Sequence, residues 1–264
     1  MLGSGQLTAV SMTPTAFIEA AGDAGLDAVS LFVQAPGPQS HFRLTTAQNL
    51  SAVRKALSDT GVTLKNIECF MLTPKTDISQ FRPAIETGSA LGATHLTTIL
   101  YDDDEQRVRD HLEQLGMIAA EHGLGVAIEF MAFTPRWNRL HAASALIDSL
   151  ADPRFRLVVD CLHLVRSGGS AADVAALPAG RVATVQLCDS LDTSAHADYL
   201  EEAGVRRLGP GQGSCALSEL MAAVEPGCYL ELEVPDPSAE NAAAHLAALT
   251  QQTRAWLQQT AGRG

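Results

Sequence analysis

The chain lacks any apolar run long enough to cross a bilayer, so its sequence predicts no membrane-spanning helix. It is also poor in positive charge, since 18 Lys and Arg residues stand against 30 Asp and Glu residues and the net charge is −12. Nucleic acids and anionic membranes are bound by positive fields, and this balance argues against both as partners. Residues 1–10 have no positively charged n-region, so no signal peptide is expected.

Cysteine is sparse and follows no metal-binding pattern. The five cysteines are odd in number, and no two have the close spacing of a zinc knuckle. Several lie inside apolar, strand-like segments, where cysteine acts as a small hydrophobic residue. These features predict a reduced, cytoplasmic protein. The chain also shows no low-complexity tract, no linker and no repeat longer than one strand and one helix.

Short strand-like segments alternate with longer helix-like segments along the whole chain. Strands are predicted at residues 6–10, 28–33, 63–70, 95–101, 125–130, 155–160, 182–188 and 228–234. Helices are predicted at residues 13–24, 47–59, 81–91, 105–121, 142–150 and about 239–259. Eight strands in 264 residues predict a single (β/α)₈ TIM barrel domain over residues 1–264. A doubly wound sheet is disfavoured, because Gly3-Ser-Gly5 precedes the first predicted strand instead of following it.

Four of the predicted strands finish on a polar side chain that can bind a metal ion. These residues are Glu129, Asp160, Gln186 and Glu233. Any one of them could cap a strand or pair with an arginine, but strand ends of a parallel barrel converge on one face. The oxygen donors predict a Mg²⁺ or Mn²⁺ site rather than structural Zn²⁺. Glu231 shares the inward parity of Glu233, which we favour because it is nearer the strand end.

Residues next to these strand ends extend the candidate site. His163 follows Asp160 in a predicted short loop and could move a proton or hold a substrate oxygen, with a backbone-bonded loop histidine as the alternative. Arg166 is interpreted as a surface or ligand-orienting residue. Arg207 precedes the Pro210-Gly211-Gln-Gly213 turn, which could hold it over the pocket to bind a substrate hydroxyl or carboxylate. The adjacent Arg206 cannot point inward as well.

Two further residues are candidates for substrate contact. Glu68 has inward parity on its strand, together with Asn66 and Phe70. Trp137 is a candidate pocket wall, although an exposed loop aromatic fits the sequence nearly as well. Specificity is expected to reside in the loops at residues 35–42, 132–140 and 191–205. The remaining histidines show no ligand spacing and are given no role; they are His41, His95, His111, His122, His141, His196 and His245.

Three segments together resemble the xylose isomerase-like TIM-barrel superfamily. They are Val126-Ala-Ile-Glu129-Phe-Met-Ala-Phe133, the run from Asp160-Cys-Leu-His163 to Gly169, and Val185-Gln186-Leu-Cys-Asp189. The Arg207 turn and Leu232-Glu233-Val234 extend the resemblance to the C-terminal part. This superfamily comprises sugar-phosphate isomerases and epimerases, together with 2-keto-myo-inositol dehydratase and 3-dehydroshikimate dehydratase. The resemblance is strong from about residue 123 onward and looser before residue 66.

The resemblance implies a divalent ion held by Glu129, Asp160, Gln186 and Glu233. Many of the epimerases carry His at the third ligand position, whereas the Gln186 version resembles the 3-dehydroshikimate dehydratase branch. Mg²⁺ or Mn²⁺ is the expected ion, with Co²⁺ or Zn²⁺ as alternatives. The resemblance also implies a homo-oligomer. Endonuclease IV shares the fold, but its histidine-rich trinuclear zinc site has no counterpart at these strand ends.

The predicted function is that of a metal-dependent isomerase, epimerase or dehydratase acting on a small polyhydroxylated carbonyl compound. Glu129 or Glu233 would remove the proton beside the carbonyl, and His163 would supply a proton to a departing hydroxyl. The substrate could be a sugar, an inosose or a dehydroshikimate-like compound in carbohydrate metabolism. The alternative is a non-catalytic barrel that binds a sugar or a partner subunit without using the metal site. Hydrolysis of a phosphate ester is disfavoured, because nothing indicates a second metal or a phosphate loop.

Overall fold

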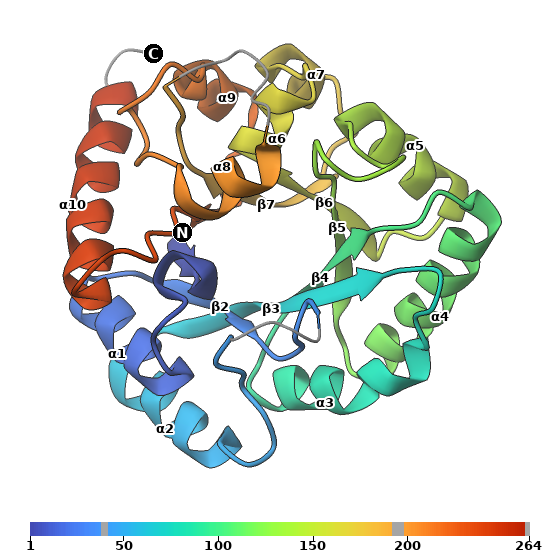
Figure 1. Cartoon of the computed structure of the whole chain (residues 1–264), viewed down its shortest axis with the longest axis horizontal. Coiled ribbons are helices and arrows are strands. Elements are labelled where there is room, and N and C mark those ends of the chain that lie inside the picture. Colours follow the sequence, from blue (N-terminus) through green and yellow to red (C-terminus); the bar gives the residue numbers. More distant parts are fainter. Residues whose placement is uncertain (38–41, 192–197, 262–264) are drawn as a thin grey trace.

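The computed structural model describes residues 1–37, 42–191 and 198–261. Within these residues eight parallel strands form a closed barrel in the order of the sequence, and β1 pairs with β8 to close it (Figure 1). The strands are β1 (Leu2–Gly5), β2 (Ala28–Phe32), β3 (Thr63–Leu72), β4 (His95–Leu100), β5 (Gly125–Glu129), β6 (Phe155–Asp160), β7 (Val182–Leu187) and β8 (Tyr229–Leu232). The predicted (β/α)₈ TIM barrel is confirmed.

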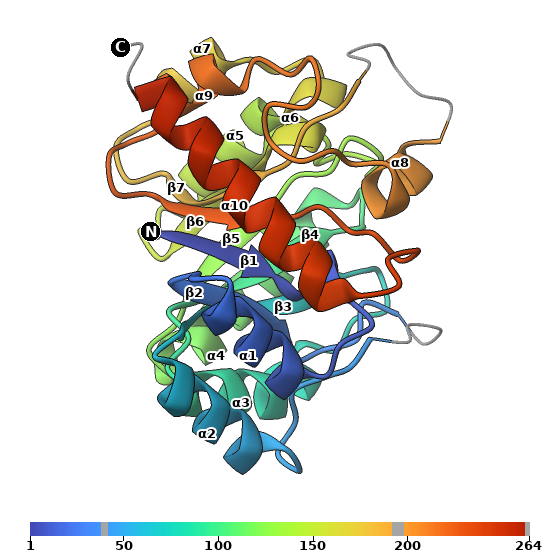
Figure 2. The ribbon, with the colours of Figure 1, turned by 90° about the vertical axis from the view of Figure 1, so that its left-hand side faces the viewer.

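Helices surround the barrel on its outer side, and the short helices α6 (Cys161–Arg166) and α8 (Tyr199–Val205) lie at its mouth (Figure 1). The others are α1 (Pro14–Asp23), α2 (Leu50–Thr60), α3 (Arg82–Ala90), α4 (Glu105–Glu121), α5 (Leu140–Leu150), α7 (Ala171–Ala175), α9 (Leu217–Ala223) and α10 (Ala242–Ala261). Two 3₁₀ helices are η1 (Gln6–Ala9) and η2 (Ile78–Phe81). Figure 2 shows α10 lying across the outside of β1 beside α1, so the two ends of the chain pack together. None of the helices in the described residues combines the length and apolar character needed to cross a membrane.

Side chains alternate along the strands as the sequence predicts. On β5 and β6, Ile128 and Val159 face outward into the main apolar core between sheet and helices. Glu129 and Asp160, of the opposite parity, are buried on the barrel side. Helix starts carry the expected caps: the Thr13 hydroxyl accepts a hydrogen bond from the Ala16 amide at 3.3 Å, and the Asp104 carboxylate accepts one from the Arg107 amide at 2.9 Å.

The first strand lies earlier than residues 6–10, where we predicted it. β1 comprises Leu2–Gly5, and residues 6–9 form η1. The glycines that argue against a strand on propensity are required by the inside of the barrel. A Cβ at Gly3 would lie 2.3 Å from the Tyr229 hydroxyl and 2.5 Å from the Ala28 carbonyl oxygen. Tyr229 therefore fills space that any larger residue at position 3 would need.

Four short helices, α6 to α9, lie outside the predicted helical ranges. Residues 161–166, expected as a loop, form α6, because the Asp160 carboxylate caps its first turn and accepts the His163 amide at 2.8 Å. Helix α8 lies within the segment 191–205 that was expected as a loop, and its first turn is capped by Asp198, which accepts the Glu201 amide at 2.9 Å. Helix α9 precedes β8. Each is too short to show a clear helical period in the sequence.

The alternation of β3 breaks near its end. The register between β3 and β4 shifts between Ile67 and Phe70. Phe70 consequently faces outward and packs edge-on against Phe81 at 5.1 Å, and its predicted inward orientation is wrong. Cys69 takes the position on the cavity side instead. Glu68 keeps the inward orientation that we predicted.

The buried His95 makes the stability of the fold depend on pH. The His95 Nε2 lies 3.0 Å from the Thr184 hydroxyl, and burial lowers the pKa of His95 to about 3, with Arg156 and Lys65 adding to the effect. The unfolded chain takes up a proton below about pH 6.5, but the folded protein resists until about 3. His95 should therefore cost stability as pH falls, by up to about 1.4 kcal/mol per pH unit.

We expect His95→Gln, which keeps a polar contact to Thr184, to flatten the acid side of the stability curve by that slope between about pH 6 and 4. Urea unfolding of both proteins at several pH values measures this. The exposed His141→Gln variant is the matched control. Parallel curves for wild type and His95→Gln would show that burial of His95 does not set the acid sensitivity.

Candidate functional site at the barrel mouth

Four buried polar residues lie where strands β5 to β8 end. Glu129 and Asp160 are the last residues of β5 and β6, Gln186 is next to last on β7, and Glu233 follows β8 directly. All four are at most 5% exposed. Strand pairing places Asp160 opposite Gln186. The C-terminal ends of the strands thus gather these donors at one mouth of the barrel, which is the face where TIM-barrel enzymes carry out their chemistry.

The four residues Glu129, Asp160, Gln186 and Glu233 form a ring of possible metal ligands. Asp160 connects this ring to helix α6. One of its carboxylate oxygens accepts the His163 amide, and the other contacts the Arg207 guanidinium. Because α6 begins at Cys161, His163 lies within its first turn and faces the barrel mouth. The His163 Nε2 is 3.9 Å from Glu129 Oε1. One possible ligand atom from each of Glu129, Asp160 and His163 falls within 4.8 Å of the others, which is close enough for a shared cation.

Arg207 is inserted between two of these acids. Its Nη1 lies 3.0 Å from Glu233 Oε2 and also contacts Asp160, and its Nε donates to the Ala203 carbonyl at 2.8 Å. The neighbouring Arg206 points away and pairs with the exposed Glu201 at 2.5 Å. Arg207 is therefore a buried positive charge inside the ring rather than a residue held over its entrance.

Gln186 has one atom that the surrounding residues leave unused. Its Nε2 donates to Glu231 Oε1 at 3.2 Å and to Glu233 Oε1 at 3.1 Å. Its Oε1 is buried and has no hydrogen-bond partner among the described residues. A buried acceptor without a partner is costly in a folded protein, and a cation would satisfy it. The donor set at the barrel mouth therefore fits a hard divalent ion.

Glu231 lies one layer below Glu233, and its partner on β2 lies two strands away, across β1. The Ser30 hydroxyl on β2 donates to Glu231 Oε2, and Gln186 donates to the other oxygen. Glu233 lines the cavity, whereas Glu231 is fully buried beneath it. Glu68, on β3, also reaches the cavity and accepts a 2.8 Å hydrogen bond from Asn66 Nδ2.

The carboxyl groups in this site raise one another's pKa values. Burial is the largest cause for Glu129, whose pKa is well above its usual range, and Glu233 and Asp160 add to it. Burial also raises the pKa of Glu233 to about 8, against the opposing effect of Arg207. For Asp160, burial acts upward, but Arg207 and His163 together outweigh it and its pKa is lowered. The site therefore brings together more carboxyl groups than its one lining guanidinium, Arg207, can pair with, among the described residues.

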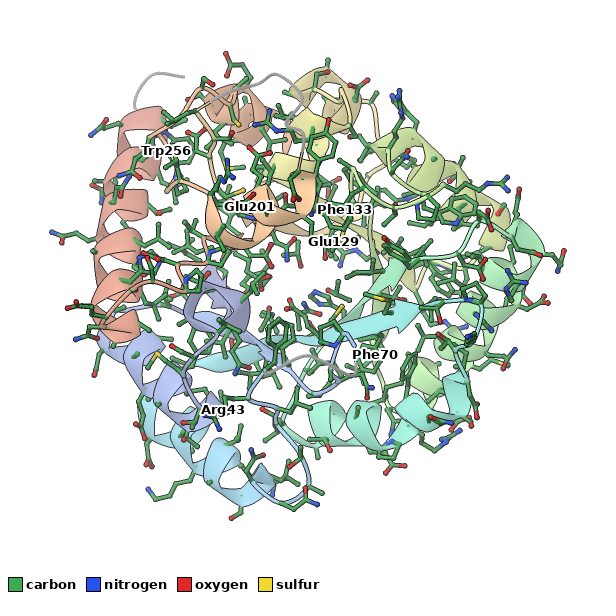
Figure 3. All side chains as sticks on the ribbon, in the orientation of Figure 1. Arg43, Phe70, Glu129, Phe133, Glu201 and Trp256 are labelled. Atoms are coloured by element: carbon green, nitrogen blue, oxygen red, sulfur yellow. The ribbon has the colours of Figure 1, made fainter. Side chains whose placement is uncertain are left out.

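His163 behaves differently from the acids around it. Burial lowers its pKa to about 4, although the charge of Asp160 opposes this. Its imidazole is therefore neutral near pH 7 and can ligate a cation or accept a hydrogen bond. The Phe133 ring meets it edge-on with a centroid distance of 5.3 Å, which fixes the imidazole plane. Figure 3 shows Phe133 and Glu129 close together near the middle of the barrel.

A family model described as xylose isomerase-like TIM barrel matches residues 18–260. The chain belongs to this family. A 3-dehydroshikimate dehydratase from Pseudomonas aeruginosa is 30% identical over 128 residues, which is 47% of this chain and 20% of that protein. The chain thus spans about a fifth of the length of this relative.

Solved structures of xylose isomerase-like barrels superpose over nearly the whole chain. The IolI protein with a bound zinc atom gives a TM-score of 0.80 at 16% identity, covering 96% of both chains. The 3-keto-D-glucoside 4-epimerase YcjR from E. coli gives 0.74 at 14% identity, covering 96% of this chain and 98% of that one. At these identities the similarity shows the shared fold.

A carboxylate holds together two of the segments that carry the family resemblance. Asp189 Oδ2 accepts the amides of Gly211 and Gly213 at 3.1 and 2.9 Å. A Cβ at Gly213 would lie 2.4 Å from Asp189 Oδ1, so only glycine fits there. Leu208, next to Arg207, pairs with Asp189 in an isolated bridge. Asp189 thereby fixes the turn that delivers Arg207 to the site, a role that sequence reasoning missed.

In this xylose isomerase-like barrel a cavity of about 280 Å³ lies above the ring. Its polar lining residues are Glu68, Thr97, Glu129, His163, Arg207 and Glu233. Much of the remaining lining is apolar and includes Leu7, Phe32, Phe42, Ile99, Met131 and Phe133. Met131 and Phe133 belong to the segment 126–133 that carries the family resemblance. The other four apolar residues carry no motif, and only their positions near strand ends could have indicated them. His41 and His196, with residues 38–41 and 192–197 of the predicted loops, lie outside the described residues.

Two predicted substrate contacts do not line this cavity. Trp137 is buried in the main core, where its Nε1 donates to the Asp102 carbonyl at 3.1 Å and joins the loops after β5 and β4. Arg166 forms a buried pair with Glu202, at 2.7 and 2.5 Å, and contacts the Ser190 hydroxyl at 2.7 Å. That pair fastens α8 to α6. Arg166 acts on the cavity through α8, which contributes Ala203 to its wall.

Proposed function

We propose that this barrel is a divalent-metal-dependent enzyme that removes a proton beside a carbonyl group, as an isomerase, epimerase or dehydratase. The unpartnered Oε1 of Gln186, surrounded by strand-end carboxylates, carries the proposal. The family membership supports it, since similar proteins include a 3-dehydroshikimate dehydratase and a sugar epimerase.

We assign the cation to Glu129, Asp160, Gln186 and Glu233, with His163 within reach as a further donor. When bound, a divalent ion supplies positive charge that polarises a carbonyl oxygen and acidifies the adjacent C–H. The oxygen-rich donor set favours Mg²⁺ or Mn²⁺. Co²⁺ and Zn²⁺ remain alternatives, because His163 offers a nitrogen donor and the similar IolI structure binds a zinc atom.

The remaining chemistry belongs to side chains that can hold or move protons. Glu233 reaches the cavity, and burial raises its pKa to about 8 before an ion is bound, so it is placed to accept and return a proton. Burial and the neighbouring acids raise the pKa of Glu68, which favours its protonated form as a donor to a departing hydroxyl. His163, with a pKa of about 4, suits hydrogen bonding better than the acid role predicted from sequence. Arg207 orients Asp160 and Glu233.

The fate of the abstracted proton distinguishes the reaction classes. Return to the opposite face is epimerisation, return to the neighbouring carbon is isomerisation, and loss of a β-hydroxyl is dehydration. The similarity to a 3-dehydroshikimate dehydratase and the amide at position 186 favour dehydration. The raised pKa of the Glu68 carboxyl, which lines the cavity, supports the same outcome.

The test is metal content and metal-dependent melting of wild type, Glu233→Ala and the surface control Glu219→Ala. At a concentration of Mn²⁺ about 100 times the dissociation constant, binding stabilises the folded state by about 2.7 kcal/mol, or about 5 to 10 °C in melting temperature. We expect this rise in wild type and Glu219→Ala and its loss in Glu233→Ala. Solvent-deuterium exchange into candidate ketones then reports proton abstraction.

A non-catalytic binding barrel is the second candidate. The observation in its favour is that the Arg207 guanidinium already lies between Asp160 and Glu233, where it supplies positive charge to the ring. If wild type binds no divalent ion and none changes its melting temperature, the metal-dependent proposal fails and this second candidate gains.

A further inference from the structure

A small apolar cluster lies apart from the main core, at the barrel mouth. Phe32, Cys69 and Ile99 form its buried part, and Leu7, Phe42, Leu44 and Met131 pack against them. The rings of Phe32 and Phe42 are 4.4 Å apart and tilted by 38°. Apart from Leu44, all of these residues line the cavity. Apolar surface collected around a cavity is characteristic of a site for an apolar part of a ligand.

Two further apolar residues line the same cavity. Phe133 stands edge-on to His163 and presents its ring to the cavity beside the acidic floor (Figure 3). Leu200, on α8, lines the same cavity and is 68% exposed, so its apolar side chain has little protein cover. Aromatic and aliphatic groups therefore make up much of the described lining beside the acidic floor.

Away from the acidic floor, the described lining offers few partners for hydroxyl groups. Away from the charged floor, Thr97 is the neutral hydroxyl among the described lining residues, and its Oγ1 has no hydrogen-bond partner among them. A buried hydroxyl without a partner is penalised on binding. A polyol with a hydroxyl on every carbon would leave several of them against Phe32, Ile99 and Met131. The wall instead suits a body that carries few polar groups.

The floor also disfavours a negatively charged ligand. Glu68, Glu129 and Glu233 line the cavity, and Arg207 is the one guanidinium among the described lining residues. That guanidinium is already paired with Asp160 and Glu233. Apart from the proposed ion, a substrate carboxylate or phosphate would therefore meet several acids and no unpaired cation of the described lining.

We propose that the substrate is an uncharged, ring-bodied carbonyl compound with its polar groups on one edge. The carbonyl and an adjacent hydroxyl face Glu129, His163 and Glu233, and the ring lies between Phe32, Phe42 and Phe133. This rests on the proposed function for the carbonyl and replaces the polyhydroxylated substrate expected from sequence. A cavity of about 280 Å³ accommodates a compound of one small ring with short substituents.

The test compares compounds that share a six-membered ring. 2-Hydroxycyclohexanone carries a ketone and one adjacent hydroxyl, 2-keto-myo-inositol adds a hydroxyl at every other carbon, and 3-dehydroshikimate adds a carboxylate. Calorimetric titration into Mn²⁺-loaded wild-type protein gives the three dissociation constants. We expect 2-hydroxycyclohexanone to bind at least tenfold more tightly than either of the others. Tighter or equal binding of the inosose or the dehydroshikimate, or no binding of any of them, overturns the proposal.

A variant in the wall separates this proposal from the metal site. Phe42→Ser is expected to weaken 2-hydroxycyclohexanone binding at least fivefold while leaving the Mn²⁺-dependent melting rise unchanged, and the exposed Leu191→Ser is its control. An unchanged affinity in Phe42→Ser contradicts the assigned wall. Absence of deuterium exchange in a ketone that binds would instead count against the proposed function, because binding preference and proton abstraction are measured separately.

Discussion

Replacement of Glu129 with glutamine is expected to abolish the Mn²⁺-dependent melting rise and to slow proton abstraction by at least about 100-fold. The amide keeps the shape of the side chain but removes a ligand charge and a candidate base. In the absence of metal, the free energy of unfolding of the variant, measured in urea, should exceed that of wild type by about 0.5–2 kcal/mol. The reason is that the charged form of Glu129 is unfavourable in the folded protein. Burial raises its pKa most, and the neighbouring Glu233 and Asp160 raise it further.

Opposite changes in stability and metal binding distinguish a functional acid from a structural one. Glu113→Gln, on the outer side of α4 with a side chain 59% exposed, is the control that changes the same charge at the surface. Titration with Mn²⁺ and urea unfolding of the three proteins measure both effects. A Glu129→Gln variant that binds Mn²⁺ like wild type would remove Glu129 from the ligand set.

Removal of the guanidinium should be the most destabilising change in the site. Arg207→Met keeps an apolar stem but leaves Asp160 and Glu233 buried without their positive partner. Loss of one partner from a buried ion pair costs about 3–5 kcal/mol, and we expect a loss of this size in metal-free protein. Added Mn²⁺ should then stabilise the variant more than wild type, because the ion becomes the remaining positive charge between these acids.

The adjacent arginine provides the matched control. Arg206 pairs with Glu201 at the surface, where its side chain is 53% exposed, and Arg206→Met should change stability by about 0 to 1 kcal/mol. Urea unfolding with and without Mn²⁺ measures all three proteins. Equal stability of Arg207→Met and wild type would mean that the acids are held in their neutral form and need no counter-charge.

The barrel fold could be predicted from the sequence because the patterns that indicate it are local and repeat along the chain. Alternating strands, helix caps and strand-end acids each depend on neighbouring residues, and together they predicted the positions of Glu129, Asp160, Gln186 and Glu233. The features that could not be predicted depend on contacts between distant segments. Gly3 must be small because Tyr229 fills its space, and Glu231 is satisfied by Ser30 on β2, two strands away across β1.

The side chains around the cavity were harder to predict than its floor. A register shift turned Phe70 outward and placed Cys69 toward the cavity, which strict alternation cannot anticipate. Trp137 is a residue type that often contacts ligands, but here its indole joins two loops. Short helices such as α8 depend on a cap and one buried pair, and these signals are too small to separate from a loop in sequence.

Asp160 links folding to function through a single carboxylate. One oxygen begins helix α6 and the other meets Arg207 at the proposed metal ring. A substitution of Asp160 would therefore lose both the helix cap and the contact with Arg207. A substitution of Gln186 would change the set of possible metal ligands without disturbing a helix start. Diversification of chemistry in barrels of this kind should proceed through the β7 position, with the β6 acid remaining fixed.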